Sequence, residues 1–576
     1  MSRHRSVVWP TLVGAVVVAL AAAIVHLGAL SGGFVYDDVE NVLRNPWVRE
    51  PGRWFEAFSH HMAAFTGRFN TSYYRPVMHV VLACARGLSG LKPAGYHALL
   101  LLMHGLAAGA VFLLAARTIA AGRMPAGRGG LSGPFAGALV FAFHPVHVEA
   151  VAWISGVVDL SAGMLAVLAL VAALSPGRLG SLVAAPTLFL AALLAKEPAV
   201  MIVPALAAYF AARGDWRDTR RRARGAAVIA ALGLALATYL LLRVNALGGL
   251  MGTEGAERVR VPAAQAVATA IALLGEYVRL LAVPWPLSAV HDFRVVTSPT
   301  DPRLWLGVVV GAGLATAAWR WRKDAPVVLG VALAILPLLP ALYVPVLGEG
   351  LVAERYLYLP TVGLSLLVAR GWDAAREWSG WRKAFLVGGL ALVLIMAGWA
   401  TVWRTAAWRD DLTLWQDAAT KVPGSAAAHE YLGAARYQRG DVAAARASYV
   451  RALEIDPGRW TARTGLAALL AAEGRHEEAI EAAQAAHRSR PGQPEPLAIA
   501  GYSLATQGRL AEAVESYARA IAIAPAVAST HNQLAIALAA QGDGEGAERE
   551  FREAVRLEPS NASYARNLAL LRSQRK

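Results

Sequence analysis

Cysteine is almost missing from this 576-residue chain, since Cys84 is the only one. A single thiol excludes a framework of intramolecular disulfides and leaves the redox compartment undetermined. Acidic residues are also scarce, with 40 Asp and Glu against 55 Lys and Arg, and charged residues make up only 16% of the chain. Hydrophobic residues reach 56%, and the mean hydropathy is +0.43. These proportions exclude an ordinary soluble globule and indicate a protein that crosses a membrane several times.

The formal charge of +15 is compatible with nucleic-acid binding only if the basic residues form one patch. They stand instead in short clusters between apolar runs, as is typical of the cytoplasmic loops of membrane proteins. The sequence therefore predicts no nucleic-acid partner. The first apolar run, 7–30, follows MSRHR; it is longer than the core of a secretory signal and lacks a convincing cleavage site, so we expect an uncleaved first span.

The chain changes character near residue 405, and its second part repeats itself every 34 residues. Four columns keep this step: Gly440, Gly474, Gly508 and Gly542; Ala445, Ala479, Ala513 and Ala547; Ala452, Ala486, Ala520 and Ala554; and Pro457, Pro491, Pro525 and Pro559. Thirty-four residues is the period of the tetratricopeptide repeat (TPR), a pair of antiparallel helices. Glycine suits the turn between the two helices, alanine their close contact, and proline the end of the second helix. We expect a linker helix over 406–425 and an α-solenoid over 426–576, with four repeats and a capping helix.

The first part reads as eleven spans joined by short loops. The expected spans are 7–30, 97–117, 133–145, 156–174, 181–195, 198–212, 226–243, 304–320, 326–346, 356–371 and 384–403. With a cytoplasmic N-terminus, the cytoplasmic loops hold most of the Arg and Lys, including Arg123 and Arg128, and the repeats lie on the outer side. The apolar segment 263–283 is either a twelfth span or a helix that lies at the outer surface.

This topology gathers ionisable residues at the outer ends of the spans. The acidic ones are Asp37, Asp38, Glu40, Glu149, Asp159, Glu197, Glu349 and Glu354, and the others are Arg75, His144, His147, Lys196 and Arg355. Because charge at membrane depth is costly, a one-sided cluster favours a functional site over interfacial anchoring. The segment 72–88 within the outer loop has the pattern of an amphipathic helix at the interface.

Seven stretches occur in an order that resembles a known family. They are FVYDDVENVLRNP, SYYRPVMHVV, GYHALLLLMHGLAAGAVF, FHPVHVEAVAWISGVVDLSAGMLAVL, AKEPAV, VPWPLSAVHDF and AERYLYLPTVG. With the repeats behind them, they resemble the transmembrane and tetratricopeptide-containing (TMTC) protein O-mannosyltransferases and their bacterial relatives, which are glycosyltransferases of the GT-C type. The chain differs by Val158, where animal members tend to have a basic residue, and by its four repeats, where they usually have more.

The resemblance implies an all-α fold, with a GT-C-like membrane domain over 1–405 whose first outer loop is 31–94. It also implies the inverting transfer of a sugar, mannose in this family, from a polyprenyl-phosphate carrier to Ser or Thr hydroxyls of proteins on the outer side. Such a transfer needs a carboxylate that accepts the hydroxyl proton. Asp37 and Asp38 are the candidates, one as the base and the other as an orienting group. The alternative is that the pair caps the helix VENVLRN.

The leaving lipid phosphate needs cations. Arg355 is the first candidate because a guanidinium binds phosphate oxygens in a bidentate manner, and Lys196 and Arg75 are the next. We assign Tyr356 and Asp159 to substrate binding as well. Glu354 and Glu197 each follow or precede one of these cations, so they bind substrate or simply pair with that neighbour.

The motif HPVHVEA places His144, His147 and Glu149 close together in sequence. The spacing alone is a weak metal signal because no further ligand is placed by it. We favour contacts with sugar or acceptor for these residues; packing or tautomer-fixing roles stay open, and no metal or other cofactor is expected, since the lipid-linked sugar is a substrate.

Two other kinds of protein remain as alternatives. One is a non-catalytic membrane-anchored TPR scaffold for envelope assembly, which needs one span rather than eleven. The other is a transporter, which is disfavoured because the ionisable residues lie at span ends rather than in mid-membrane. For the transferase, the expected partners are the lipid-linked donor, membrane lipid and acceptor proteins held by the repeats. The expected location is a bacterial inner membrane, with the repeats periplasmic.

Overall fold

A computed structural model describes residues 2–66, 71–120, 130–250, 261–343, 350–559 and 561–574. Arg123, Arg128 and Glu349 lie outside these residues. The described part of the chain is helical and contains no β-strand, as expected for an all-α protein. The chain forms two compact units, 1–65 with 71–414, and 66–70 with 415–576.

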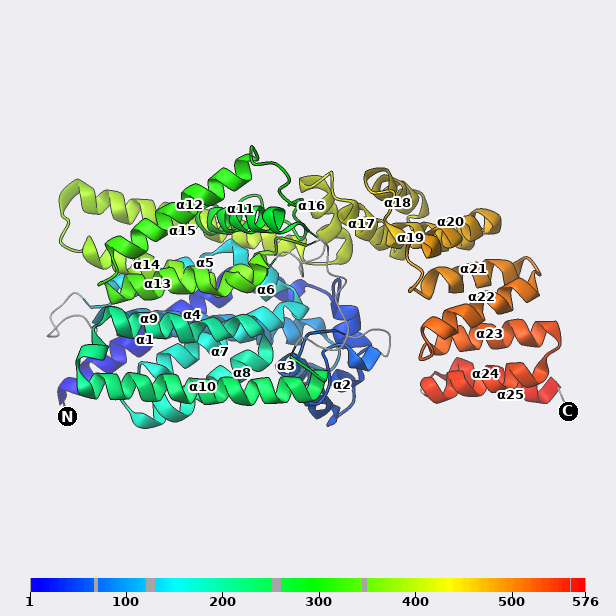
Figure 1. Cartoon of the computed structure of the whole chain (residues 1–576), viewed down its shortest axis with the longest axis horizontal. Helices are drawn as coiled ribbons and strands as arrows, with labels where there is room; N and C mark the ends of the chain where they lie inside the picture. The colour runs from blue at the N-terminus through cyan, green and yellow to red at the C-terminus, as the bar shows by residue number, and fades with distance from the viewer. Residues whose placement is uncertain are drawn as a thin grey trace. The chain divides into compact units, whose positions relative to one another are not determined.

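The first unit, the membrane unit, is built from long apolar helices (Figure 1). Its α-helices are α1 (Ser2–Val25), α2 (Pro46–Arg49), α3 (Pro76–Ser89), α4 (Pro93–Ala120), α5 (Ser132–Phe143), α6 (Val148–Ala152), α7 (Val157–Ala173), α8 (Ala185–Ala195), α9 (Ile202–Ala212), α10 (Thr219–Leu247), α11 (Ala263–Ala282), α12 (Pro302–Arg320), α13 (Ala325–Ile335), α14 (Pro360–Ala374) and α15 (Gly380–Ala407). Short helical turns η2 (Val39–Leu43), η5 (Pro145–His147), η6 (Ile154–Gly156), η7 (Gly180–Ala184), η8 (Glu197–Met201), η10 (Leu336–Leu342) and η12 (Glu354–Leu357) connect them. Helix α16 (Asp411–Lys421) falls within the expected linker 406–425 and crosses the boundary between the units.

Each of the eleven expected spans overlaps a helix of the membrane unit, and three of them also cover the short turns η7, η8 and η10. Six described helices are long and apolar enough to cross a membrane by themselves, and α5 with the bent segment after it makes a seventh. Those six include α11 and leave out several of the shorter expected spans. The chain is thus an integral membrane protein, and eleven as the number of its spans stays a prediction.

Helix α11 carries the segment whose position the sequence left open. The Thr269 hydroxyl accepts a hydrogen bond from the backbone of Val296, and the Tyr277 hydroxyl donates to the carbonyl of Leu351. The carbonyl of Leu281 contacts His144 at 3.0 Å. Helix α11 also packs along α12, because a Cβ atom on Gly307 of α12 would lie 2.0 Å from the carbonyl oxygen of Ile271 on α11. Since a span and a surface helix could both make these contacts, the position of this segment stays a prediction.

Small residues allow the helices of the membrane unit to pack closely. A Cβ atom on Gly137 of α5 would lie 2.2 Å from the carbonyl oxygen of Ser365 on α14. A Cβ on Gly363 of α14 would lie 2.3 Å from the carbonyl oxygen of Gly330 on α13. Since the lipid offers no hydrophobic drive for association, such backbone contacts are a main source of helix packing in membranes.

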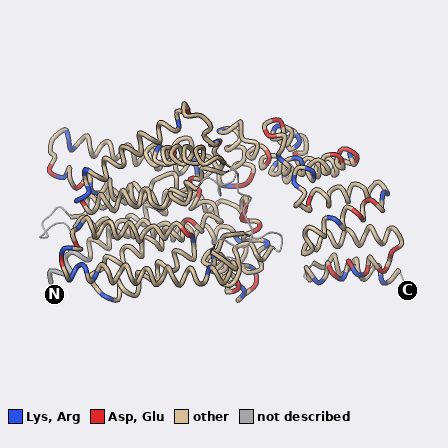
Figure 2. The backbone as a smooth tube through the Cα atoms, viewed as in Figure 1, with Lys and Arg blue, Asp and Glu red and all other residues tan. Residues whose placement is uncertain are grey.

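The membrane unit has two chemically different ends. The start of α1, the end of α4, the start of α5 and the connections α9–α10, α12–α13 and α14–α15 lie at one end, which we name the basic face (Figure 1). Figure 2 shows many of the unit's Lys and Arg positions along the backbone at that end. The opposite end, the cavity face, holds residues 31–65 and 71–91 and the starts of α7, η8 and η12. This is the charge asymmetry that the positive-inside rule predicts for a cytoplasmic basic face.

The second unit confirms the repeats and their register. Its helices are α17 (Ala426–Gln438), α18 (Val442–Ile455), α19 (Trp460–Ala472), α20 (His476–Ser489), α21 (Glu495–Thr506), α22 (Leu510–Ile523), α23 (Ala528–Gln541), α24 (Gly544–Leu557) and α25 (Ala562–Gln574). All four column glycines lie in the turn between two helices with φ between 77° and 90°, a conformation that only glycine adopts without strain. The alanines of both columns are fully buried between helices.

Large rings fill the core between repeats. Tyr517 on α22 is 1% exposed and rests on Gly501, where an added Cβ would lie 2.9 Å from the ring. We expect Tyr517→Ala to destabilise the repeat unit by about 3–5 kcal/mol, as ring deletions in cores do. Thermal unfolding of the full chain, monitored by the susceptibility of the repeat unit to proteolysis, measures the loss. Tyr502→Ala is the control because that ring is 46% exposed, and equal losses in both variants would contradict the packing described.

Candidate functional site

The cavity face contains a cavity of about 350 Å³. Its charged lining comes from five separate segments of the chain: Arg75, Asp159, Lys196, Glu197, Arg243 and Arg355. Four cations against two carboxylates leave an excess of positive charge in a largely apolar recess. Such a recess suits an anionic group on an apolar carrier.

Two of the expected phosphate ligands meet at one carboxylate. The ammonium of Lys196, at the end of α8, lies 2.5 Å from Oδ1 of Asp159 in the first turn of α7. The guanidinium of Arg355 lies 4.0 Å from Oδ2 of the same Asp159 and also pairs with Glu149 of α6. The backbone N–H of Arg355 donates to the other oxygen of Glu149 at 2.9 Å. Glu149 therefore fixes Arg355 in position while the guanidinium stays partly exposed to the cavity.

Glu197 pairs with two arginines and not with its neighbour Lys196. Its Oε2 lies 3.6 Å from Arg75, and its Oε1 lies 3.0 Å from Arg243 near the end of α10. Arg243 also donates to the carbonyl of Ser72 at 2.7 Å. One carboxylate thus holds two cations at the cavity wall.

Aromatic rings support these cations. The ring of Tyr356 lies 4.6 Å from the ammonium of Lys196 and 5.2 Å from the guanidinium of Arg355. Arg75 lies 4.2 Å from the ring centre of Tyr73. Because a ring face attracts a cation without neutralising it, the positive charge stays available to a ligand.

Asp38 is fully buried, and both of its oxygens are engaged. Oδ1 accepts from the backbone N–H of Ser155 at 2.7 Å and from its hydroxyl at 2.6 Å, and Oδ2 accepts from the N–H of Val35 at 3.0 Å. Burial raises the pKa of Asp38 to about 7, although these hydrogen bonds act in the opposite direction. Asp38 connects the loop after α1 to η6. The alternative that it caps the helical turn η2 is wrong, because its side chain accepts no hydrogen bond from that turn.

Asp37 differs from Asp38 in its exposure and in its contacts. Its side chain is exposed and makes no hydrogen bond or ion pair with any residue in the described part of the chain. Desolvation by the protein around the carboxyl raises its pKa to about 6, while the charge of Arg355 lowers it and that of Glu40 raises it. Asp37 is thus an unoccupied carboxylate within electrostatic reach of the cation that lines the cavity.

The backbone before Asp37 is strained. Tyr36 has a φ of 54°, the only positive φ of a non-glycine residue that the described chain shows. Its N–H donates to Asp411 at 2.8 Å, and its ring lies 5.7 Å from that of Trp153. Strained conformations of this kind persist only where neighbouring contacts hold them, and they concentrate at functional sites.

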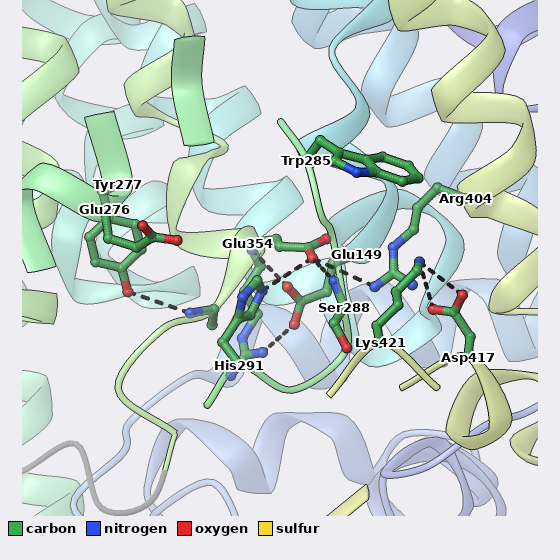
Figure 3. A network of polar contacts seen from close by, with 12 residues as sticks. Glu149, Glu276, Tyr277, Trp285, Ser288, His291, Glu354, Arg404, Asp417 and Lys421 are labelled. Carbon is green, nitrogen blue, oxygen red and sulfur yellow. Dashed lines mark hydrogen bonds and ion pairs between the residues drawn. The ribbon is translucent and has the colours of Figure 1, made fainter. Parts of the chain in front are cut away.

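Glu354 lies away from the cavity. It is completely buried and accepts from the N–H of Ser288 at 2.5 Å, with His291 at 3.3 Å and Arg404 at 3.6 Å (Figure 3). The alternative that Glu354 pairs with the adjacent Arg355 is therefore wrong. Glu354 ties the loop after α11 to η12 and α15, so a contact with substrate gains no support from its position.

His144 and His147 are also buried outside the cavity. Nε2 of His144 contacts the carbonyl of Leu281 at 3.0 Å, and Nε2 of His147 lies 2.6 Å from the hydroxyl of Thr361. The ring of His147 packs 4.7 Å from that of Tyr358, centre to centre. The geometry favours the packing and tautomer-fixing roles over the contacts with sugar or acceptor that we expected. In the described part of the chain, no group of three His, Cys, Asp or Glu side chains is placed to hold a metal ion.

Two residues of the site were not identified from the sequence. Arg243 follows an apolar run as the last residue of an expected span, and that single charge at a span end was the available signal. Ser155 lies in an apolar stretch and carries no charge, so nothing in the sequence marked it as the partner of Asp38.

The fold and the cavity define a class: a helical integral membrane protein with a cationic recess at one face and a TPR solenoid. Comparison with family models confirms the solenoid, because a tetratricopeptide repeat model matches residues 412–459, 432–494 and 532–575, and a TPR repeat model matches 501–542. A thermophilic TPR protein of Thermus thermophilus aligns with 32% of this chain and 94% of its own at 19% identity and a TM-score of 0.26.

Comparison with curated proteins shows which members of this class the chain is similar to. Protein O-mannosyl-transferase Tmtc1 of Drosophila melanogaster is 27% identical over 70% of this chain and 57% of its own length. Human protein O-mannosyl-transferase TMTC1 is 25% identical over 74% of this chain and 53% of its own length. The chain is therefore a relative of the TMTC proteins, as its ordered motifs indicated, and it spans a little over half the length of these two.

Proposed function

We propose that this chain is a membrane glycosyltransferase that moves a sugar from a polyprenyl-phosphate carrier to Ser or Thr hydroxyls of proteins. One observation carries the proposal: the unengaged carboxylate of Asp37 lies within electrostatic reach of Arg355, which lines a cavity with three further cations. The names of the relatives support mannose as the sugar.

In the proposed reaction, the carboxylate of Asp37 accepts the proton of the acceptor hydroxyl as its oxygen attacks C1 of the sugar. The bond between C1 and the phosphate oxygen breaks, and the lipid phosphate leaves with the electron pair. Attack from the face opposite the leaving group inverts the configuration at C1. A hydroxyl acceptor needs a base for this step, so we propose that no metal or other cofactor takes part.

The cations of the cavity would hold the phosphate on which negative charge develops. Arg355 and Lys196 share Asp159, while Arg75 and Arg243 share Glu197, so all four are fixed before substrate binds. Preorganised charge of this kind stabilises a leaving group without reorganisation during the reaction. Asp38 would act as a positioning residue that holds the strained loop of Asp37 against η6.

The acceptor protein would be bound by the repeats. A recess of about 420 Å³ between α17 and α23 is lined by Tyr437, Tyr502 and Tyr517 and by small side chains. Stacked helix pairs form a concave surface suited to extended peptides. By the positive-inside rule the basic face would be cytoplasmic, which places the cavity and the repeats on the outer side of a bacterial inner membrane.

The pH dependence follows from the raised pKa of Asp37. The base acts only when ionised, so kcat/KM should rise with pH through about 6 and level off above it. At one pH unit below the midpoint, about one tenth of the maximum should remain. Transfer to a Ser-containing peptide, measured across the pH range from acid to weakly alkaline, checks the curve. A rate that is flat across this range would contradict the role of Asp37.

In cells, the proposal predicts a missing modification. Mass spectrometry of envelope proteins from cells with and without the gene should find hexosylated Ser or Thr peptides only when the gene is present. An Asp37→Asn chain expressed at the same level should resemble the deletion. Identical glycopeptides in all three strains would contradict the proposal.

A further inference from the structure

A second charged recess lies at the basic face, at the opposite end of the bundle. This basic pocket has a volume of about 560 Å³ and joins the ends of α4, α9, α12 and α14 with the starts of α10 and α13. Its basic lining residues are Arg213, Arg221, Arg320, Lys323 and Arg370, and its acidic ones are Asp324 and Asp373. A topological bias alone scatters cations over loops, whereas here five of them surround one hollow.

Three of the five basic side chains form ion pairs with carboxylates of the protein, and two do not. Arg370 lies 2.7 Å from Asp324, and Arg213 and Arg221 lie 3.5 and 3.9 Å from Asp215. The side chains of Arg320 and Lys323 make no ion pair or hydrogen bond with any residue that the structure describes. The pocket therefore offers two uncompensated cations beside three that are held in place.

An apolar groove continues from this pocket. It has a volume of about 680 Å³ and lies between α9, α12 and α13, with Leu314, Ala318, Val328, Val331 and Leu336 among its lining residues. The groove and the basic pocket share Ala212, Trp321 and Lys323, so one ends where the other begins. In Figure 1, α12 runs obliquely to α13.

The length of the groove is comparable to the thickness of one leaflet of a membrane. The stretch of α10 from Arg221 at the basic pocket to Arg243 at the cavity is about 33 Å long, close to the ~30 Å thickness of the hydrocarbon core. The groove follows α13 from Val327 to Ile335, about 12 Å, or somewhat less than half that thickness. Trp319 and Trp321 are 67% and 48% exposed beside the pocket, as is typical of side chains at the level of the head groups.

We propose that the basic pocket and the groove together bind one anionic phospholipid of the leaflet opposite the cavity. Arg320 and Lys323 contact the phosphate, and an acyl chain lies in the groove between α12 and α13. A phosphate alone would leave most of the basic pocket empty, and Thr118 and Asp373 line the remaining polar space. This favours a head group that carries hydroxyls, such as glycerol, over a bare phosphate monoester. Basic pockets between helices on the cytoplasmic side suit such lipids.

The test uses the purified full chain and phosphatidylglycerol, with phosphatidylcholine as the neutral reference. Native mass spectrometry after gentle delipidation counts retained phosphatidylglycerol, and the shift in Tm on adding the lipid measures its binding. The double variant Arg320→Gln/Lys323→Gln should lose retention and bind the lipid roughly tenfold or more weakly, since two charged contacts are removed. Arg376→Gln/Lys383→Gln is the matched control, because it removes the same charge from the α14–α15 region without touching either recess.

A second variant tests the groove separately from the charge. Val331→Trp fills the groove while the cations remain, so it should abolish retention of phosphatidylglycerol and leave any response to inorganic phosphate unchanged. Equal retention in the wild type and the Arg320→Gln/Lys323→Gln variant would overturn the proposal. It would also be overturned if inorganic phosphate alone reproduced the shift in Tm, which would indicate a free-anion site, or if polyprenyl phosphate displaced phosphatidylglycerol at equal concentration. None of these readouts depends on sugar transfer.

Discussion

Replacing Asp37 with Asn is expected to lower kcat by a factor of about 10² to 10⁴, the usual contribution of a general base. KM for the donor should change little, because Asp37 lines no part of the cavity wall and makes no ion pair with the residues described there. Stability should not fall, because the carboxylate makes no ion pair or hydrogen bond to lose and its raised pKa means that the ionised form costs folding free energy near neutral pH. Transfer kinetics with a polyprenyl-phosphate sugar and a Ser-containing peptide measure the change.

Glu40→Gln supplies the control for Asp37→Asn. Glu40 belongs to the same loop, is 43% exposed, and pairs with Arg44 at 2.6 Å. Its loss removes the same charge from the same loop but should leave kcat within a factor of about two, because an exposed pair on a turn contributes little. Full activity of Asp37→Asn, or an equal loss in both variants, would refute the assignment of the base.

Replacing Lys196 with Met should lower the stability of the membrane unit strongly. Lys196 and Asp159 are 7% and 9% exposed, and breaking such a buried pair typically costs about 3–5 kcal/mol because the remaining charge is buried without its partner. Arg355, 4.0 Å from Asp159, compensates part of that charge, so we expect the lower end of this range. Thermal unfolding of the purified chain measures the loss.

The double variant Lys196→Met/Asp159→Leu separates stability from function. Replacing both charges with apolar side chains should restore most of the stability lost in Lys196→Met. KM for the lipid-linked donor should nevertheless stay raised, by roughly tenfold, in both variants, because a cation beside the phosphate is missing. Recovery of both stability and donor KM in the double variant would mean that the pair serves the fold alone.

The repeats could be predicted in detail because their determinants are local. Gly508 is needed at a turn with φ of 78°, and Ala513 lies a few residues further along the same repeat. A 34-residue step therefore fixes helices, turns and core together. The positions of the longer membrane helices followed in the same way from runs of apolar residues.

The site could be predicted only in part. Lys196, Arg355 and Asp159 were found because each charge interrupts or borders an apolar run, and the structure brings all three to one cavity. Arg243 was missed because its partners, Glu197 and Ser72, lie 46 and 171 residues away. Pairing over such distances is set by helix packing, which the sequence does not display.

The two adjacent aspartates show most clearly what could not be predicted from the sequence. From the sequence, Asp37 and Asp38 were equivalent candidates for the base. The difference between them arises because Ser155, 117 residues away, donates twice to Asp38 and leaves Asp37 unoccupied. Only the tertiary structure separates the two roles that we propose, a base and a positioning residue.

The most direct test of the central claim is a single reaction of the purified full chain with polyprenyl-phosphate mannose and a Ser/Thr peptide. Mass spectrometry should find a peptide heavier by one hexose on a hydroxyl, together with an equal amount of released polyprenyl phosphate. The folded Asp37→Asn variant should form both products at least about a hundredfold more slowly. If the folded wild-type chain forms no glycopeptide while its repeats still bind the peptide, the proposed transfer is contradicted in favour of a non-catalytic scaffold.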